Sequence, residues 1–238
     1  MSASANPLEV VHNLVGITLP EGWVVKEKIK RETSDTGGYF SVSYLVEKTS
    51  GEAAFMKVLN LAKALTMPGD QLRNIQNLIT TFNFERDTLD VCRSNNFKRV
   101  ATALSHGKLE IPGNIFGVYY IIFELAQGCI RKHMAKIGSL DRMWILRSLH
   151  HTANGIRQLH SKKISHQDIK PSNVLIFSGV ESKVADLGCA DIKYGASPRG
   201  GLMVAGDQSY APIELLYGEV SPLWERRRMG TDMYLLAV

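Results

Sequence analysis

Apolar and polar residues alternate along much of the first half of the chain, which is the pattern of half-buried β-strands. Residues 23–30, 39–48 and 53–59 follow it, and turn-rich stretches separate them, so we expect a three-stranded meander. Two further strand-like segments lie around residues 100–109 and 116–125. Residues 1–22 show no strong periodicity and are expected to form a leader before the first strand.

Helical spacing appears between these strands and again in the second half. After Asp70, apolar residues recur every three or four positions, which predicts a helix that Asp70 caps and that continues through Glu85 to Val91. The residues of this stripe are Leu72, Ile75, Ile79 and Phe82. Beyond Gly128 the pattern is mainly helical, and Ser139 is expected to cap a long helix. The residues of that helix expected to face a core are Ile145, Leu149, Ala153, Ile156 and Leu159.

The composition is that of a folded protein rather than a disordered one. With 238 residues, 45% of them hydrophobic, the chain can bury a sizeable core as one large domain or two small lobes. The net charge of +5 comes mostly from dispersed basic residues, apart from the run Arg226–Arg228. No aromatic residues interleave with this run for base stacking, so we interpret it as a solvated surface turn and expect no nucleic-acid partner.

Cysteines and apolar segments bear on the cellular setting. Cys92, Cys129 and Cys189 lie far apart without a CxxC or zinc-site spacing, which fits a reducing cytoplasm. The N-terminus lacks the basic and apolar regions of a secretory signal. The most apolar stretch, residues 118–123, is too short to cross a bilayer, so no membrane insertion is expected.

The candidate chemistry concentrates in the stretch His166–Asn173 and in Asp186–Gly188, which begins thirteen residues after Asn173. A carboxylate, an ammonium group, an amide and a second carboxylate follow one another there, from Asp168, Lys170, Asn173 and Asp186. Phosphoryl transfer needs such groups to converge on Mg²⁺, nucleotide and attacking hydroxyl. The alternative is a polar loop in which Asp168 and Asn173 cap turns, and the joint spacing with Asp186 argues against it.

In this form the stretch resembles the catalytic loop and the metal-binding triplet of protein kinases. Its Asp-x-Lys-Pro-x-Asn order is closer to serine/threonine kinases than to tyrosine kinases. The resemblance implies that Asp168 orients the substrate hydroxyl and accepts its proton, and that Lys170 balances charge on the transferred phosphoryl group. It also implies Asn173 and Asp186 as ligands of Mg²⁺.

The resemblance extends over most of residues 23–238 and implies an ATP site. Lys57, at the end of the third expected strand, matches the family lysine that contacts the α- and β-phosphates, with Glu85 as its helix partner. Val42 matches the residue that covers the base. Without the motif order, Lys57 reads as an ordinary strand-end lysine and Glu85 as a solvated helix carboxylate.

The glycine-rich loop is the weakest match. Asp35 and Phe40 replace the outer two glycines around Gly37 and Gly38, and both replacements hinder a close approach of the backbone to phosphates. A simple hairpin turn is the alternative for these residues.

Aromatic residues line the expected adenine pocket. Phe55 replaces a usual alanine and is expected to share a strand face with Lys57. Three outcomes are open for this bulk beside the base: a lower ATP affinity, another pose of the nucleotide, or a local bulge that absorbs it. Phe123 and the residues from Glu124 to Ala126 resemble the gatekeeper and the hinge. Buried aromatic packing describes Phe123 equally well.

Gln167 replaces the arginine of the family's His-Arg-Asp motif. We therefore expect no cation beside Asp168 to grip a phosphorylated activation segment, and activity that does not require such phosphorylation. His166 is expected to be a packed core histidine. Asp207 replaces a common threonine near Asp168, and Pro212–Glu214 stands for the family's Ala-Pro-Glu.

These features predict an α+β, two-lobed protein-kinase-like fold. It comprises a leader at 1–22, an antiparallel β N-lobe with one helix at 23–125 and an incomplete, mainly helical C-lobe at 126–238. Truncation within the C-lobe's central helix predicts poor stability for this chain and a partner chain that covers the exposed surface. The expected function is ATP- and Mg²⁺-dependent phosphorylation of serine or threonine in protein substrates. The alternatives are a pseudokinase or nucleotide-binding scaffold, a small-molecule phosphotransferase and an inactive fragment.

Overall fold

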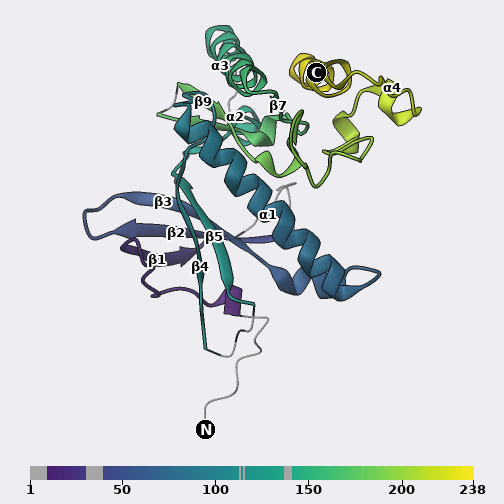
Figure 1. Cartoon of the computed structure of the whole chain (residues 1–238). Coiled ribbons are helices and arrows are strands. Elements are labelled where there is room, and N and C mark those ends of the chain that lie inside the picture. Colours follow the sequence, from purple (N-terminus) through teal and green to yellow (C-terminus); the bar gives the residue numbers. More distant parts are fainter. Residues whose placement is uncertain (1–9, 31–39, 113, 115, 137–140, 179) are drawn as a thin grey trace. The chain divides into compact units, whose positions relative to one another are not determined.

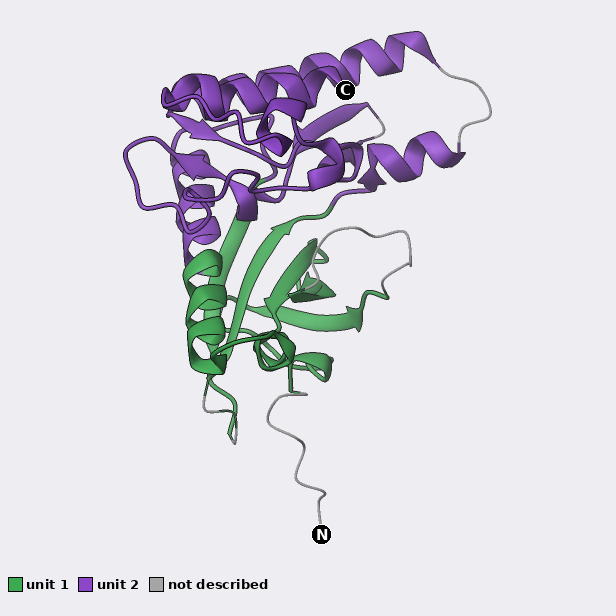
Figure 2. Ribbon diagram, turned by 90° about the vertical axis from the view of Figure 1, so that its right-hand side faces the viewer, with its two compact units in different colours: residues 1–82, 102–125 green, residues 83–101, 126–238 purple. Residues whose placement is uncertain are grey.

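The computed structural model describes residues 10–30, 40–112, 114, 116–136, 141–178 and 180–238. The chain divides into two compact units, residues 1–82 with 102–125 and residues 83–101 with 126–238 (Figure 2). One boundary between the two units, after residue 82, falls within helix α1 (Gln71–Ser94). Residues 83–101, which the sequence placed in the N-lobe, therefore belong to the second unit.

A five-stranded antiparallel sheet forms the centre of the first unit, in the order β1-β2-β3-β5-β4 (Figure 1). Its strands are β1 (Trp23–Lys28), β2 (Ser41–Lys48), β3 (Ala53–Leu59), β4 (Ala103–Leu109) and β5 (Val118–Glu124). Every second residue of β2 and of the first part of β3 is buried, because successive side chains point to opposite faces of a sheet. The predicted meander and the two later strands are confirmed.

Residues 10–22, which are the described part of the expected leader, pack into the core of the first unit. The segment opens with a 3₁₀ turn, η1 (Val10–His12), and buries Val11, Leu14 and Leu19 in the same cluster as the sheet residues. The Tyr44 hydroxyl donates a hydrogen bond of 2.8 Å to the carbonyl oxygen of Val11. This segment is therefore part of the unit rather than a separate lead-in.

Helix α1 follows a second 3₁₀ segment, η2 (Leu61–Thr66), and starts where the sequence predicts. The Asp70 carboxylate accepts a 2.8 Å hydrogen bond from the backbone N–H of Arg73, which caps the first turn. Ile75 and Phe82 are buried as predicted, but Leu72 is 75% exposed. Its predicted place in the stripe is wrong because the buried face begins one turn later.

The described part of the second unit is mainly helical, with two short sheets. Besides the C-terminal part of α1, its helices are α2 (Ile130–Lys136), α3 (Arg142–Ser161), α4 (Ile213–Leu216) and α5 (Gly230–Ala237). Its strands are β6 (Gly128–Cys129), β8 (Val174–Phe177) and β9 (Glu181–Val184) in one sheet, and β7 (Ile164–Ser165) with β10 (Asp191–Ile192) in the other. Short turns are η3 (Pro171–Asn173), η4 (Leu187–Cys189), η5 (Gln208–Tyr210) and the π-helical η6 (Glu225–Met229). Among the described helices, none has both the length and the apolar character needed to span a bilayer.

Helix α3 buries a face that differs in part from the predicted one. Its cap is Asp141, whose carboxylate accepts backbone N–H groups of the first turn at 2.9 and 3.3 Å; the predicted cap, Ser139, lies outside the described residues. Ile156 and Leu159 are buried as predicted, whereas Leu149 is 47% exposed, so its prediction is wrong. The buried face consists of Trp144, Ser148, Thr152, Gly155, Ile156 and Leu159.

Candidate active site

The proposed catalytic loop occupies residues 166–170 in the second unit, between strand β7 and turn η3. Ile164 before it and Ile169 within it are 1% and 3% exposed, so buried apolar side chains fix both its entry and its centre. Pro171 is the first residue of η3, where its missing N–H costs no hydrogen bond. The loop is thus held by buried apolar residues on both sides of its polar stretch, residues 165–168.

Asp168 lies at the centre of a hydrogen-bonded cluster and is 8% exposed. Its Oδ1 accepts a 2.9 Å bond from the backbone N–H of Asp207, and its Oδ2 accepts a 2.8 Å bond from the Asn173 side-chain amide. The Lys170 ammonium nitrogen lies 3.1 Å from the same Oδ2. The structure therefore brings together three of the residues that the loop motif singled out, Asp168, Lys170 and Asn173.

Lys170 lies between two carboxylates. Its Nζ is 3.1 Å from Asp168 Oδ2 and 3.2 Å from Asp207 Oδ2. Burial alone would lower the pKa of Lys170, but the charges and hydrogen bonds of these two carboxylates outweigh it, and the pKa is raised. Lys170 is therefore a fixed positive charge in direct contact with Asp168. Asp207, which replaces a common threonine, adds the second negative charge.

The backbone around the loop is held in uncommon conformations. Gln167 and Asp186 have φ angles of 69° and 66°, in the left-handed region that residues other than glycine seldom adopt. Asp232 of α5, 0% exposed, accepts hydrogen bonds from the backbone N–H groups of His166 and Gln167, each at 2.8 Å. These bonds help to hold Gln167 in its uncommon conformation. Asp232 also pairs with His160 at 2.8 Å.

His166 is packed in the interior of the second unit. It is 0% exposed, and its Nε2 lies 2.9 Å from the carbonyl oxygen of Ala185. The prediction of a core histidine is confirmed.

Gly188 lies close to both Asp186 and Glu85 within the second unit. A methyl group placed on Gly188 would lie 3.4 Å from Asp186 Oδ1 and 3.7 Å from Glu85 Oε2. Glu85 is only 4% exposed, so the alternative of a solvated helix carboxylate is wrong. Its predicted partner, Lys57, belongs to the first unit, and their pairing stays a prediction.

The donor set suits Mg²⁺. The amide nitrogen of Asn173 donates to the side chain and to the carbonyl oxygen of Asp168, both at 2.8 Å, and the contact of its Oδ1 with the Ser172 hydroxyl is a long one of 3.5 Å. Together with the Asp186 carboxylate, this Oδ1 provides hard oxygen donors. No cluster of three or more His, Cys, Asp or Glu side chains able to hold a metal occurs among the described residues. Mg²⁺ commonly takes only one or two carboxylates and completes its shell with water and phosphate oxygens.

The predicted nucleotide-binding residues of the first unit lie on its sheet. Val42 of β2 pairs with Val58 of β3, and Lys57 lies between Ser43 and Ile121 of the flanking strands. Gly37 and Gly38 lie outside the described residues. The first unit thus presents Lys57 from a strand with partners on both sides.

Phe55 and Phe123 face each other across β3 and β5. Their ring centroids are 6.4 Å apart with the planes tilted by 52°, which is a favourable aromatic arrangement. Phe55 and Lys57 are both partly buried and share one strand face, while the intervening Met56 is fully buried. A phenyl ring therefore flanks Lys57, as predicted.

The residues expected to form the hinge, Glu124 to Ala126, connect the first unit to the second along the chain. Glu124 ends the first unit's sheet, and its Oε1 accepts a 2.7 Å hydrogen bond from the backbone N–H of Thr102. Ala126 opens the last part of the second unit, and the next residue, Gln127, donates its N–H to the Ile176 carbonyl at 2.9 Å. Each end of this short segment is therefore anchored in its own unit.

The interpretation of Arg226–Arg228 as a solvated turn is wrong for Arg228, while Arg226 is exposed as expected. Arg228 is 0% exposed and forms an ion pair with Asp191, with 2.7 Å between Arg228 Nε and Asp191 Oδ2. Its Nη1 donates to Gln167 Oε1 at 3.1 Å, so a buried cation lies beside the residue that precedes Asp168, with Asp191 as its counter-charge. No signal in the three-arginine run distinguishes the buried member.

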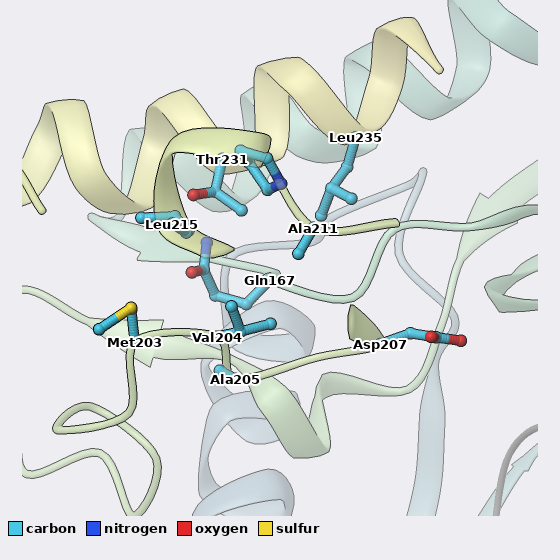
Figure 3. Close-up of a pocket in the computed structure, with 10 residues that line it drawn as sticks. Gln167, Met203, Val204, Ala205, Asp207, Ala211, Leu215, Thr231 and Leu235 are labelled. Atoms are coloured by element: carbon cyan, nitrogen blue, oxygen red, sulfur yellow. The ribbon is translucent and has the colours of Figure 1, made fainter. Parts of the chain in front are cut away.

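A small, mainly apolar hollow lies beside Gln167 in the second unit (Figure 3). It is lined by Gln167, Met203, Val204, Ala205, Asp207, Ala211, Pro212, Leu215, Thr231 and Leu235. The loop, the segment that follows β10 and helix α5 therefore meet at one place.

Residues 36–224 match the family model of the protein kinase domain. This match covers most of the chain, which therefore belongs to the protein kinase family. Its fold is the α+β kinase fold, with an antiparallel sheet in the first unit and helices in the second.

Curated relatives carry the same family name. The chain is 26% identical over 192 residues to serine/threonine-protein kinase par-4 of Caenorhabditis elegans, with 77% of this chain and 28% of the relative covered. It is 25% identical over 226 residues to serine/threonine-protein kinase PknA of Mycobacterium tuberculosis, with coverages of 94% and 47%. An aurora kinase of Dictyostelium discoideum is 38% identical over 82 residues, which is 31% of this chain and 21% of that protein. The chain thus spans less than half the length of each of these relatives.

Proposed function

We propose that this protein transfers the γ-phosphoryl group of Mg²⁺-bound ATP to serine or threonine hydroxyls of protein substrates. The observation that carries the proposal is the buried cluster in which Asp168 contacts Lys170 and Asn173 at 2.8–3.1 Å. The family and the names of the relatives support the substrate class.

In the proposed reaction, Asp168 orients the substrate hydroxyl and accepts its proton as the hydroxyl oxygen bonds to phosphorus. The bond from phosphorus to the leaving oxygen of the diphosphate breaks in the same displacement. Lys170 is in contact with Asp168 and stays protonated, so it can balance charge on the transferred group. Asn173 and Asp186 would hold Mg²⁺, which supplies charge neutralisation at the phosphates.

Lys57 and Glu85 are proposed to pair and to orient the nucleotide phosphates, with Gly37, Gly38, Val42, Glu124 and Ala126 around the nucleotide. Free thiols at Cys92, Cys129 and Cys189 support the proposed cytoplasmic location, because disulfides are rare there.

The second candidate is a pseudokinase or nucleotide-binding scaffold. Phe55 favours it, because its ring lies on the strand face of Lys57, where an adenine base would be accommodated. Asp35, Phe40 and Gln167 are further departures from the family pattern.

Two substitutions separate transfer from binding. Asp168→Asn should leave Mg²⁺-ATP binding intact and lower kcat by about 10²–10⁴, because it removes the proton acceptor. Asp186→Asn should weaken Mg²⁺-ATP binding itself. Asp87→Asn, whose side chain is 65% exposed, is the matched control and should change neither quantity. Radiolabelled phosphate transfer and nucleotide titration measure the two effects separately.

A kcat of Asp168→Asn equal to that of the parent would remove the assigned role. A parent that binds Mg²⁺-ATP and transfers no phosphate to proteins would instead favour the scaffold.

A further inference from the structure

A guanidinium group is buried at the point where three segments of the second unit meet. Arg228 belongs to the π-helical turn η6, immediately before α5, and its side chain is 0% exposed. Removing a charge from water is costly unless partners replace the lost hydration. A fully buried arginine therefore has to satisfy its donors within the protein, and its partners identify what it holds together.

The partners of Arg228 come from three places in the chain. Asp191 of β10, 5% exposed, supplies the counter-charge at 2.7 Å. Nη2 donates to the carbonyl oxygens of Gly200 and Leu202 at 2.7 and 2.8 Å. Nη1 donates to Gln167 Oε1 at 3.1 Å. Both terminal nitrogens thus donate hydrogen bonds, and Nε is in ionic contact with Asp191 without hydrogen-bond geometry. Lysine does not reproduce this rigid fork of several donors.

Gln167 is bound by Arg228 in both directions. Its side-chain carbonyl accepts from the guanidinium, and its Nε2 donates to the backbone carbonyl oxygen of Arg228 at 2.7 Å. Gln167 directly precedes Asp168 and has the left-handed φ of 69°. A residue in such a conformation needs surrounding contacts that fix it, and Arg228 provides two of them.

The other contacts of Arg228 lead to Asp168 along the chain. Gly200 and Leu202 lie in the segment between β10 and Asp207, and within it Arg199 donates to the carbonyl oxygen of Ala205 at 2.9 Å. The segment ends at Asp207, whose N–H bonds to Asp168 Oδ1. One buried cation therefore touches the residue before Asp168 and the segment that returns to Asp168 from the other side.

We propose that Arg228 is a positioning residue that fixes the segment 193–206 and Gln167 around Asp168 through its own buried contacts, without an added phosphate. The proposal rests on the proposed kinase function for its catalytic consequence, but not for its structural one. The negative charge that orders the segment is the internal carboxylate of Asp191, which occupies Arg228 Nε, while the backbone carbonyls occupy Nη2. The regulatory consequence is activity that is independent of phosphorylation within this segment.

Hydrogen–deuterium exchange on the whole chain tests the structural part without any need for activity. Arg228→Lys keeps a charge near Asp191 but not the fork to two carbonyl groups. We expect amide exchange in residues 193–206 to accelerate by about tenfold or more, as for the loss of a hydrogen bond to a charged group. Arg228→Met should produce a larger effect there. Arg226→Met, at an exposed position of the same turn, should exchange like the parent.

Exchange of residues 193–206 in Arg228→Lys equal to that of the parent would overturn the proposal. If Arg228→Met loses protection from exchange throughout the second unit, the exchange of residues 193–206 in Arg228→Lys decides whether Arg228 acts on this segment. Loss of protection throughout the unit in both variants would also overturn it, because Arg228 would then support the unit as a whole rather than this segment.

Kinetics tests the catalytic part. In an active parent, Arg228→Lys should lower kcat at least about tenfold with the KM for ATP unchanged, as expected for a residue that acts on the position of Asp168. Phosphatase treatment of the parent should leave kcat unchanged, and a loss restored by rephosphorylation of Ser197, which lies within the segment, would contradict the proposal. A parent without transfer activity would refute the proposed function, while the exchange result would still decide the role of Arg228.

Discussion

Gly206 occupies a position where the protein has no room for a side chain. A methyl group there would collide with the carbonyl oxygen of Gln167 and would lie 2.8 Å from Asp168 Oδ1. Both atoms belong to the loop that holds Asp168, and a backbone carbonyl cannot move aside as a flexible side chain can. The absence of a Cβ at Gly206 is therefore a condition for the contact between Asp207 N–H and Asp168.

Gly206→Ala should destabilise the protein by about 1–3 kcal/mol, the range for overpacking a filled site. It should also lower transfer activity, because any relief of the collision displaces Asp168. Gly201→Ala is the matched control, since nothing lies within 4 Å of a methyl group at that position. Urea unfolding of the two variants gives the comparison, and equal free energies of unfolding would contradict the predicted crowding.

Asp207 links the acid stability of the protein to its candidate site. Burial raises the pKa of this carboxyl group, but the N–H of Ser209 and the nearby Lys170 outweigh it, so the folded-state pKa lies below the ordinary 3.8. A carboxyl group with a depressed pKa stabilises the folded state above its ordinary pKa and loses that contribution as the pH falls through the folded-state value.

Asp207→Asn should accordingly be less stable than the parent near neutral pH, and the difference should shrink as the pH falls below about 4. Unfolding free energies measured from pH 7 to pH 3 test this prediction. Asp207→Glu, which keeps a carboxylate, should retain the pH dependence. A difference between Asp207→Asn and the parent that grows toward low pH would contradict the sign.

The sequence predicted which residues supply the chemical groups of the candidate site, but it did not predict which side chains are buried. Asp168, Lys170 and Asn173 meet as their spacing indicates, because they lie on one short loop. Arg228 was misjudged, since its burial depends on Asp191 and on Gln167, which is 61 positions away in the sequence. Nothing local separates a buried arginine from its exposed neighbours in the same run.

At the scale of elements, helix α3 depends on a glycine in its middle. A methyl group on Gly155 would lie 2.5 Å from the carbonyl oxygen of Arg99 and would overlap a methyl group of Val184 in β9. Helix propensity alone predicts that Gly→Ala stabilises a helix by about 1 kcal/mol. Because α3 lies so close to these neighbours, we expect Gly155→Ala to destabilise the protein instead of stabilising it.

We therefore expect Gly155→Ala to destabilise the protein by about 1–3 kcal/mol. The control is Gly230→Ala in α5, where the nearest atom would be 3.9 Å away and propensity should prevail, with a gain of about 0.5–1 kcal/mol. Chemical denaturation of both variants checks the opposite signs. A stabilised Gly155→Ala would show that α3 can shift away from β9.

The strands of the first unit and helix α3 show which features of an element the sequence pattern could and could not predict. The strands of the first unit follow from alternation, since one sheet face is buried and every second residue reports it. The buried face of α3 includes Ser148 and Thr152, with the Thr152 hydroxyl donating to the Ser148 carbonyl at 2.8 Å. A face lined by small polar residues carries no hydrophobic stripe, so Leu149 was assigned to the core and is exposed.

At the scale of the whole molecule, the residues proposed to bind the nucleotide are divided between the two units. Lys57 and Val42 belong to the first unit, and Asn173 and Asp186 to the second. A ligand that contacts residues of both units raises the free energy of unfolding of both, because it binds only where both are folded. Nucleotide binding is thus a test of how the two units act together.

The expected result is a stabilisation of about 2.7 kcal/mol with Mg²⁺-ATP at 100 times its dissociation constant. Hydrogen exchange should then slow in peptides from both units, including β3 and the loop 166–173, and thermal unfolding should shift upward. ATP with a chelator should have a much smaller effect, because Asp186 and Asn173 are proposed to act through the metal. Asp186→Asn should lose most of the Mg²⁺-dependent shift, and Asp168→Asn should keep it. Protection confined to one unit would contradict a site that both units share, and an equal shift with chelator would remove the metal from the proposed mechanism.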